Sequence, residues 1–151
     1  MQALTLDTPV VRDDVAAKGG KAIGRYAQHT ARVLLGLIFF VFGMNGFLQF
    51  IPPPPPEAFP AGAAAFSGAM MQTGYLLQLV AGVEVLVGAL LLVNRFVPLA
   101  LTLIAPVVVN IVLFHLYLSP MGTEIAFVVL ALELFLAYRH RTAFRPMLTA
   151  R

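Results

Sequence analysis

The chain has 151 residues, of which 60% are hydrophobic and only 11% are charged. Because soluble domains carry about 25% charged residues, this composition excludes an ordinary soluble domain, and it equally excludes intrinsic disorder. The sequence contains no cysteine, which excludes disulfides, iron–sulfur clusters, zinc sites with thiolate ligands and thiol chemistry.

A basic tail opens the chain and is followed by a long apolar domain and a second basic tail. We place these three parts at residues 1–30, 31–138 and 139–151. Glycine is a poor helix former. We therefore expect Gly19, Gly20 and Gly24 to weaken any helix over residues 15–25.

Four apolar stretches occupy most of the central domain, at about residues 33–51, 75–93, 96–118 and 122–138. A helix that spans the membrane needs about 20 mostly apolar residues, and the first three stretches reach this length. The fourth is shorter and contains Glu124 and Glu133. The sequence therefore predicts an all-α membrane protein, a bundle of four transmembrane helices.

A cleaved signal peptide is the competing interpretation of the first stretch, because the alanine-rich residues 60–67 resemble a cleavage site. The apolar run is longer than the core of a typical signal peptide, and it begins only at residue 33. Both features favour a transmembrane helix that is retained.

The segment between the first two stretches has two parts. Residues 52–56 are prolines, which cannot continue a helix and are expected to be extended. Residues 58–72 are small and apolar, and we expect a short helix on the outer membrane interface. A structureless loop is the alternative.

The placement of the basic residues predicts the topology. All ten lysine and arginine residues precede the first stretch, lie in the turn between the second and third stretches, or follow the fourth stretch, and residues 52–74 and 119–121 contain none. By the positive-inside rule, both termini are then cytoplasmic. In that position the basic residues meet anionic lipid headgroups, so we expect no nucleic-acid partner.

Polar side chains inside the predicted spans are concentrated from the middle of the membrane outward. Five of them are candidates for ligand binding or proton relay: Glu84, Asn45, Asn110, His115 and Glu133. Glu84 lies roughly 14 Å deep, near the middle of a hydrocarbon core about 30 Å thick, and Glu133 lies at a similar depth. This distribution predicts a polar pocket that opens toward the outer side.

No lysine or arginine lies at the middle of the membrane to pair with Glu84 or Glu133. Each carboxyl is therefore protonated, hydrogen-bonded to another side chain, or bound to a cation or ligand. For Glu84, a functional role and a packing role are equally compatible with the sequence. For Glu133 and His115, packing is favoured. The acidic residues and the histidine are not spaced like the ligands of a known type of metal site. A bis-histidine haem needs two histidines inside the bundle, and the spans contain only one. No catalytic residue is identified.

The two predicted hairpins resemble each other. In each, an asparagine in the first helix is followed by a proline, and a glutamate in the second helix is followed by an arginine. A duplication about an axis along the membrane normal would place both pairs, Asn45 with Glu84 and Asn110 with Glu133, around one bundle axis. The glycines at positions 36, 43, 46, 82 and 88 are expected to allow close helix approach.

Several short motifs are shared with a known family. They are Ala31-Arg32-x-x-x-Gly36 with Phe39 and Gly43, Gly82-x-Glu84-x-x-x-Gly88 with Leu91, Asn94-Arg95-Phe96 with Pro98-Leu99, and Ala105-Pro106 followed by Asn110-Ile111-x-x-Phe114-His115. On these motifs the chain resembles the DoxX family of small bacterial four-helix membrane proteins, over about residues 31–138. The resemblance implies a bacterial inner-membrane location, a quinone as cofactor and redox subunits as partners. It carries over Glu84 as the acid of the second span.

Three functions are compatible with these features. The first is an accessory subunit of a quinone-linked membrane redox complex, and the second is a non-catalytic membrane scaffold or assembly protein. The third and weakest is a small-solute transporter, which would need a homo-oligomer to enclose a pore. The sequence leaves open whether the protein is itself an enzyme, because any redox step needs a bound cofactor or a partner subunit.

Overall fold

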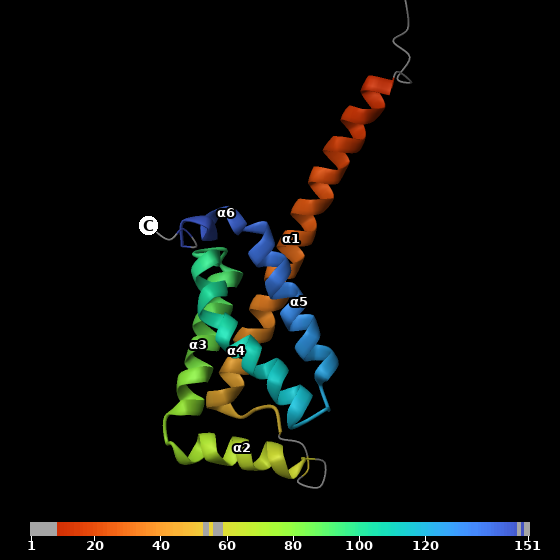
Figure 1. The fold of residues 1–151 in the computed structure, drawn as a ribbon. Coiled ribbons are helices and arrows are strands. Elements are labelled where there is room, and N and C mark those ends of the chain that lie inside the picture. The colour runs from red at the N-terminus through yellow and green to blue at the C-terminus, as the bar shows by residue number, and fades with distance from the viewer. Residues whose placement is uncertain (1–8, 53–54, 56–58, 148, 150–151) are drawn as a thin grey trace, which may run out of the picture.

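The computed structural model describes residues 9–52, 55, 59–147 and 149. Within these residues the secondary structure is entirely helical, which confirms the all-α prediction (Figure 1). The elements are α1 (Pro9–Leu48), α2 (Ala61–Gln72), α3 (Leu76–Leu92), α4 (Val97–Tyr117), α5 (Thr123–Arg139) and α6 (Arg141–Phe144), followed by a 3-10 turn (Arg145–Met147).

Helices α1, α3, α4 and α5 form a bundle, and α2 lies across one end of it (Figure 1). We call this the proline end, because Pro60 and Pro120 lie there. At the opposite end, the N-terminal half of α1 extends beyond the bundle, and the α3–α4 turn and α6 lie at this same end of the bundle (Figure 1). We call this the basic end, after Arg95, Arg139 and Arg141.

The structure contains helices that are suited to a membrane. Two segments, Ala22–Leu48 and Val97–Tyr117, are long and apolar enough to cross a membrane. The number of candidate spans rises to three when α2 and α3, which are bent by 92° at the break between them, are counted as one span. Helices α3 and α5 have 17 residues each, about 26 Å at 1.5 Å per residue. The prediction of transmembrane helices is therefore confirmed, whereas four separate spans and the orientation of the termini stay predictions.

Helix α1 is longer than expected. It begins at Pro9, a residue that is favourable at the first helical position, and it passes through Gly19, Gly20 and Gly24 without a break. The glycines do not interrupt the helix, because a glycine costs only about 1 kcal/mol and a long apolar helix follows; that they weaken it stays a prediction. The predicted helix over residues 58–72 is confirmed as α2, whereas most of the proline run lies outside the described residues.

A tight turn joins α3 to α4 at the basic end. The N–H of Arg95 donates to the carbonyl of Leu90 (2.9 Å), and the N–H of Asn94 donates to the carbonyl of Leu91 (3.1 Å). Asn94 has a φ of +56°, which asparagine tolerates better than most residues. This pair of hydrogen bonds is the Schellman arrangement that ends many helices, and it reverses the chain.

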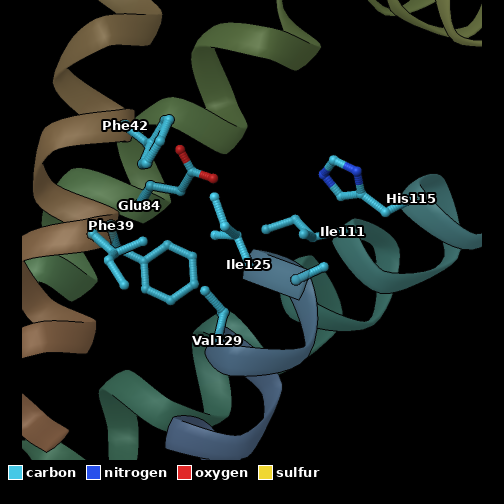
Figure 2. Close-up of a pocket in the computed structure, with 9 residues that line it drawn as sticks. Phe39, Phe42, Glu84, Ile111, His115, Ile125 and Val129 are labelled. Carbon is cyan, nitrogen blue, oxygen red and sulfur yellow. The ribbon is translucent and has the colours of Figure 1, made fainter. Parts of the chain in front are cut away.

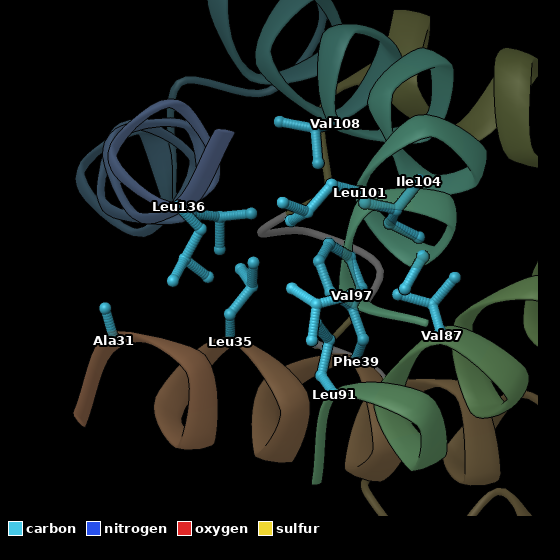
Figure 3. Packing of buried hydrophobic residues seen from close by; sticks show 12 residues of the cluster. Ala31, Leu35, Phe39, Val87, Leu91, Val97, Leu101, Ile104, Val108 and Leu136 are labelled. Carbon is cyan, nitrogen blue, oxygen red and sulfur yellow. The ribbon is translucent and has the colours of Figure 1, made fainter. Parts of the chain in front are cut away.

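An apolar cluster holds the four long helices together (Figure 3). Leu35 and Phe39 of α1, Leu91 of α3, Ile104 of α4 and Leu136 of α5 are all almost completely buried. They recur at helical spacing on the inner face of each helix. The cluster therefore holds the helices together on the basic-end side of the cavity described below.

Glycines bring α1 and α3 into close contact. A Cβ atom added at Gly43 would lie 2.7 Å from the backbone nitrogen of Val85, and one added at Gly46 would lie 2.6 Å from the Cβ of Ala81. At Gly88 the added atom would lie 2.5 Å from the backbone nitrogen of Phe40. Contacts this short exclude any larger residue without movement of a backbone. The predicted close approach is confirmed at positions 36, 43, 46 and 88, but not at position 82, where nothing lies within 4 Å.

Arg32 has a structural role that its sequence position does not reveal. Its side chain is only 8% exposed, and Nη1 donates to the carbonyls of Leu91 and Leu92 in the last turn of α3. A cation there satisfies carbonyl groups that lack helical partners and interacts favourably with the helix dipole. The Nε atom is buried without a partner among the described residues.

Replacing Arg32 with methionine is expected to lower the free energy of unfolding by about 1 kcal/mol. The lost hydrogen bonds to α3 outweigh the relief of the unpaired Nε atom. Arg25→Met on the exposed part of the same helix is the matched control and should leave stability unchanged. The measurement is denaturant unfolding in detergent micelles followed by circular dichroism. Equal stability of the Arg32→Met and Arg25→Met proteins would contradict the proposed role.

Candidate functional site

A cavity of about 300 Å³ lies inside the bundle, in the half nearer the proline end. We call it the central cavity. All four long helices line it (Figure 2), through residues that include Phe39, Phe42, Glu84, Ile111, His115 and Ile125. Its volume is at the lower end of the range for small-molecule sites, about 300–1,000 Å³, and such sites are lined mostly by apolar groups with a few polar ones.

Glu84 and His115 are the titratable side chains of this cavity. They project into it from α3 and α4 and face each other across it, with the apolar side chains of Ile111 and Ile125 beside them (Figure 2). Within the described part of the chain, no hydrogen bond or ion pair engages the carboxyl of Glu84. The cavity therefore presents an unengaged carboxyl group at one side and an imidazole at the other.

Contacts at the proline end fix the ring of His115. Its Nδ1 lies 3.0 Å from the carbonyl oxygen of Ser119. Because a carbonyl only accepts hydrogen bonds, Nδ1 must carry the proton of this bond, which leaves Nε2 of the neutral ring as an acceptor toward the cavity. The ring also packs edge-on against Phe114 with centroids 5.4 Å apart, and Phe114 packs against Phe66 of α2 at 5.7 Å. Helix α2 is thereby linked to the cavity wall.

Gly122 also contributes to the position of the His115 ring. Its φ of +88° begins the turn into α5, and an added Cβ atom would lie 2.9 Å from the Cε1 of His115. Glycine therefore serves two purposes here, a backbone conformation that other residues seldom adopt and the space that the imidazole occupies. A glycine also lies against Glu84 on α3, because a Cβ atom added at Gly43 of α1 would lie 2.9 Å from the Cβ atom of Glu84.

Alanine at Gly122 is expected to weaken ligand binding in the central cavity, whereas alanine at Gly74 should not. Both glycines have a positive φ, so both variants lose about 1–2 kcal/mol of stability through backbone strain. Nothing lies within 4 Å of an added Cβ at Gly74, whereas the atom at Gly122 would push the His115 ring. Binding isotherms of the two variants, measured at a temperature where both are folded, separate strain from ring displacement. Equal affinities would show that the ring position is irrelevant.

The other predicted site residues lie elsewhere. The Oδ1 atom of Asn45 accepts a hydrogen bond from the N–H of Ile51 (2.7 Å), so this side chain stabilises the end of α1. Asn110 is exposed, because the inward positions of α4 are those of Ile104, Val108, Ile111 and His115, and position 110 falls on another face. Neither asparagine is among the lining residues of the central cavity.

Glu133 is only 7% exposed, and it lines a second cavity of about 390 Å³ between α4 and α5. The structure therefore does not gather the two asparagine–glutamate pairs around one site, as the likeness of the hairpins suggested. Within the residues that the structure describes, no group of three or more histidine, aspartate or glutamate side chains is placed to hold a metal ion.

Sequence reasoning missed Ser119 and Gly122 as positioning residues of His115. The sequence did contain a signal for these contacts, the turn Ser-Pro-Met-Gly, which lies within seven residues of the histidine. Such a turn reverses the chain, so that its carbonyl groups lie near the end of α4. The apolar wall residue Ile125 was missed because nothing distinguishes it from the apolar residues that surround it in α5.

A comparison with protein families supports the resemblance noted in the sequence. The family model described as DoxX matches residues 27–116, more than half of the chain, from the second half of α1 to the end of α4. Glu84 and His115 both lie inside the matched region. No curated protein and no solved structure matches the chain.

Proposed function

The chain belongs to the DoxX family of membrane proteins, and on that premise we propose that it is an accessory subunit of a quinone-linked redox complex, with a quinone headgroup bound in the central cavity. The family is often associated with redox-related functions. The observation that carries the proposal is the placement of Glu84 and His115 on opposite sides of an otherwise apolar cavity.

The chemistry of a hydroquinone fits this arrangement. Its ring has two apolar faces, which suit Phe39, Phe42 and Ile111, and its two hydroxyl groups point in opposite directions. Glu84 would hold one hydroxyl through its carboxylate, and Nε2 of His115 would accept from the other, because Nδ1 is committed to Ser119. An apolar cavity with two converging polar groups is typical of a cofactor site.

When bound, a hydroquinone supplies two electrons and two protons to the complex. The carboxylate of Glu84 and Nε2 of His115 would be the two proton acceptors, one at each side of the ring. A partner redox subunit would have to accept both electrons, since the chain has no cysteine to form a dithiol couple. The accessory role follows from this division, in which the chain holds the ring and exchanges protons while the partner exchanges electrons.

The proposed topology places α1, α3, α4 and α5 across a bacterial inner membrane, with the basic end and both termini in the cytoplasm. The distribution of all ten basic residues supports this orientation. Helix α2 then lies on the outer surface, and the central cavity opens toward that side. At about 26 Å, α3 and α5 are slightly short for a core about 30 Å thick, a mismatch that local thinning of the bilayer absorbs.

A non-catalytic scaffold or assembly protein is the second candidate function. It is favoured by the use of polar side chains to hold helix ends, as Asn45 does for α1 and Arg32 for α3. Under this alternative, Glu84 is packing material, and the central cavity holds no specific ligand.

Photolabelling with a photoreactive hydroquinone probe, kept reduced under anaerobic conditions in native membranes, tests the proposal. We expect labelled peptides from α1 and α5, at positions such as Phe42 and Ile125, because these side chains line the cavity beside Glu84 and His115. Excess unlabelled hydroquinone should abolish this labelling. Labelling that persists in excess hydroquinone, or that is confined to exposed residues such as Val128, would contradict the proposal and favour the scaffold.

A further inference from the structure

The cavity between α4 and α5 differs in character from the central cavity, and none of the lining residues is common to both. We call it the α4–α5 cavity. It lies nearer the basic end, where Phe144 of α6 is part of its wall, and most of its surface comes from aliphatic side chains such as Leu101, Ala105 and Val109. Its lining includes two polar side chains, Glu133 and Thr102.

Glu133 has no charged or hydrogen-bonding partner within the described residues, although it is only 7% exposed. The hydroxyl of Thr102 donates to the carbonyl of Pro98 (3.0 Å). Two basic side chains of the basic end are engaged elsewhere, since Nε of Arg139 donates to Gln28 (3.1 Å) and the guanidinium of Arg141 lies 4.7 Å from the ring centroid of Tyr138. The carboxyl of Glu133 is thus available to a ligand.

We propose that the α4–α5 cavity binds a lipophilic amine, whose ammonium group pairs with Glu133 and whose apolar body fills the space between the helices. A carboxylate in an apolar environment is stabilised by an opposite charge and by hydrogen-bond donors, and an ammonium group provides both. Leu134 and Val109 line the cavity and are more than half exposed, so the ligand enters sideways from the bilayer. This site is independent of the function proposed for the central cavity.

Two cage compounds of the same shape test the proposal on the full-length protein in lipid nanodiscs. They are 1-aminoadamantane and 1-adamantanol, which differ only in the polar group. We expect the amine to bind the wild-type protein more tightly than the alcohol. In Glu133→Gln, the affinity for the amine should fall by roughly 10- to 100-fold, because a charge-assisted contact is lost. Equal binding of both compounds to the wild type, or unchanged amine binding in Glu133→Gln, would overturn the proposal.

Two further variants keep the outcome decisive. Ala105→Leu fills the α4–α5 cavity while retaining Glu133, so it should also abolish amine binding, even if Glu133→Gln fails to fold. Glu84→Gln alters the central cavity and should bind the amine like the wild type, whatever its effect on quinone binding. Loss of amine binding in Glu84→Gln, with retention in Ala105→Leu, would place the amine in the central cavity and contradict the proposal.

Discussion

Replacing Glu84 with glutamine is expected to weaken hydroquinone binding by roughly 10- to 100-fold. The carboxylate accepts a charge-assisted hydrogen bond from one hydroxyl of the ligand, and such bonds contribute about 1.5–3 kcal/mol. Glutamine has nearly the same shape, so the cavity walls at Phe39 and Phe42 are preserved and the loss reports the charge alone. The measurement is equilibrium binding of a short-chain hydroquinone to the purified protein under anaerobic conditions.

Glu124→Gln provides the matched control for this charge removal. Glu124 lies in the first turn of α5, at the same end of the bundle, but it is exposed and does not line the central cavity. Its removal changes the net charge by the same amount, so hydroquinone affinity should stay at the wild-type value. Parallel loss of affinity in both variants would indicate a general electrostatic effect, and no loss in Glu84→Gln would remove the carboxyl from the site.

Replacing Gly88 with alanine is expected to lower the free energy of unfolding by about 3 kcal/mol, the upper end of the usual effect of overpacking. The added Cβ would lie 2.5 Å from the backbone nitrogen of Phe40 and 2.8 Å from the carbonyl oxygen of Gly36. Both are backbone atoms, so no side-chain rotation relieves the contact and α1 must move away from α3. Denaturant unfolding in detergent micelles, followed by circular dichroism, measures the change.

Gly82→Ala distinguishes this steric effect from the helix propensity of alanine. Gly82 lies in the same helix as Gly88, but an added Cβ there meets nothing within 4 Å. Because alanine is the better helix former by about 1 kcal/mol, the Gly82→Ala protein should be as stable as the wild type or slightly more stable. A similar loss in both variants would show that close packing of α1 against α3 is not what position 88 requires.

The sequence predicted the helices well because apolar length and punctuation by proline and glycine determine them locally. The four apolar stretches correspond to α1, α3, α4 and α5 within a few residues at most of their ends. The exception is the start of α1, because this helix of 40 residues continues through Gly19, Gly20 and Gly24 to Pro9, well before the first apolar stretch. Local propensity is a weak influence when a long helix continues on one side.

The candidate site was only partly predictable, because the sequence gives depth more reliably than direction. The sequence placed Glu84 near the middle of the membrane and His115 nearer the outer surface, and the structure brings both to one cavity. Asn110 has a similar depth, but a shift of one residue from Ile111 turns it away from the interior. Arg32 was interpreted only as a topology signal, since its contacts with the end of α3 depend on the packing of two helices that are distant in sequence.

The total content of quinone and hydroquinone, in protein purified gently under anaerobic and reducing conditions, tests the central claim most directly. The proposed function predicts that wild-type protein and Glu124→Gln retain quinone in a stoichiometric amount, and that Glu84→Gln loses it while remaining folded. Extraction into organic solvent and chromatography of the extract provide the measurement. Wild-type protein without quinone above the level carried by an unrelated membrane protein, or equal quinone in Glu84→Gln and the wild type, would contradict the assignment of the central cavity.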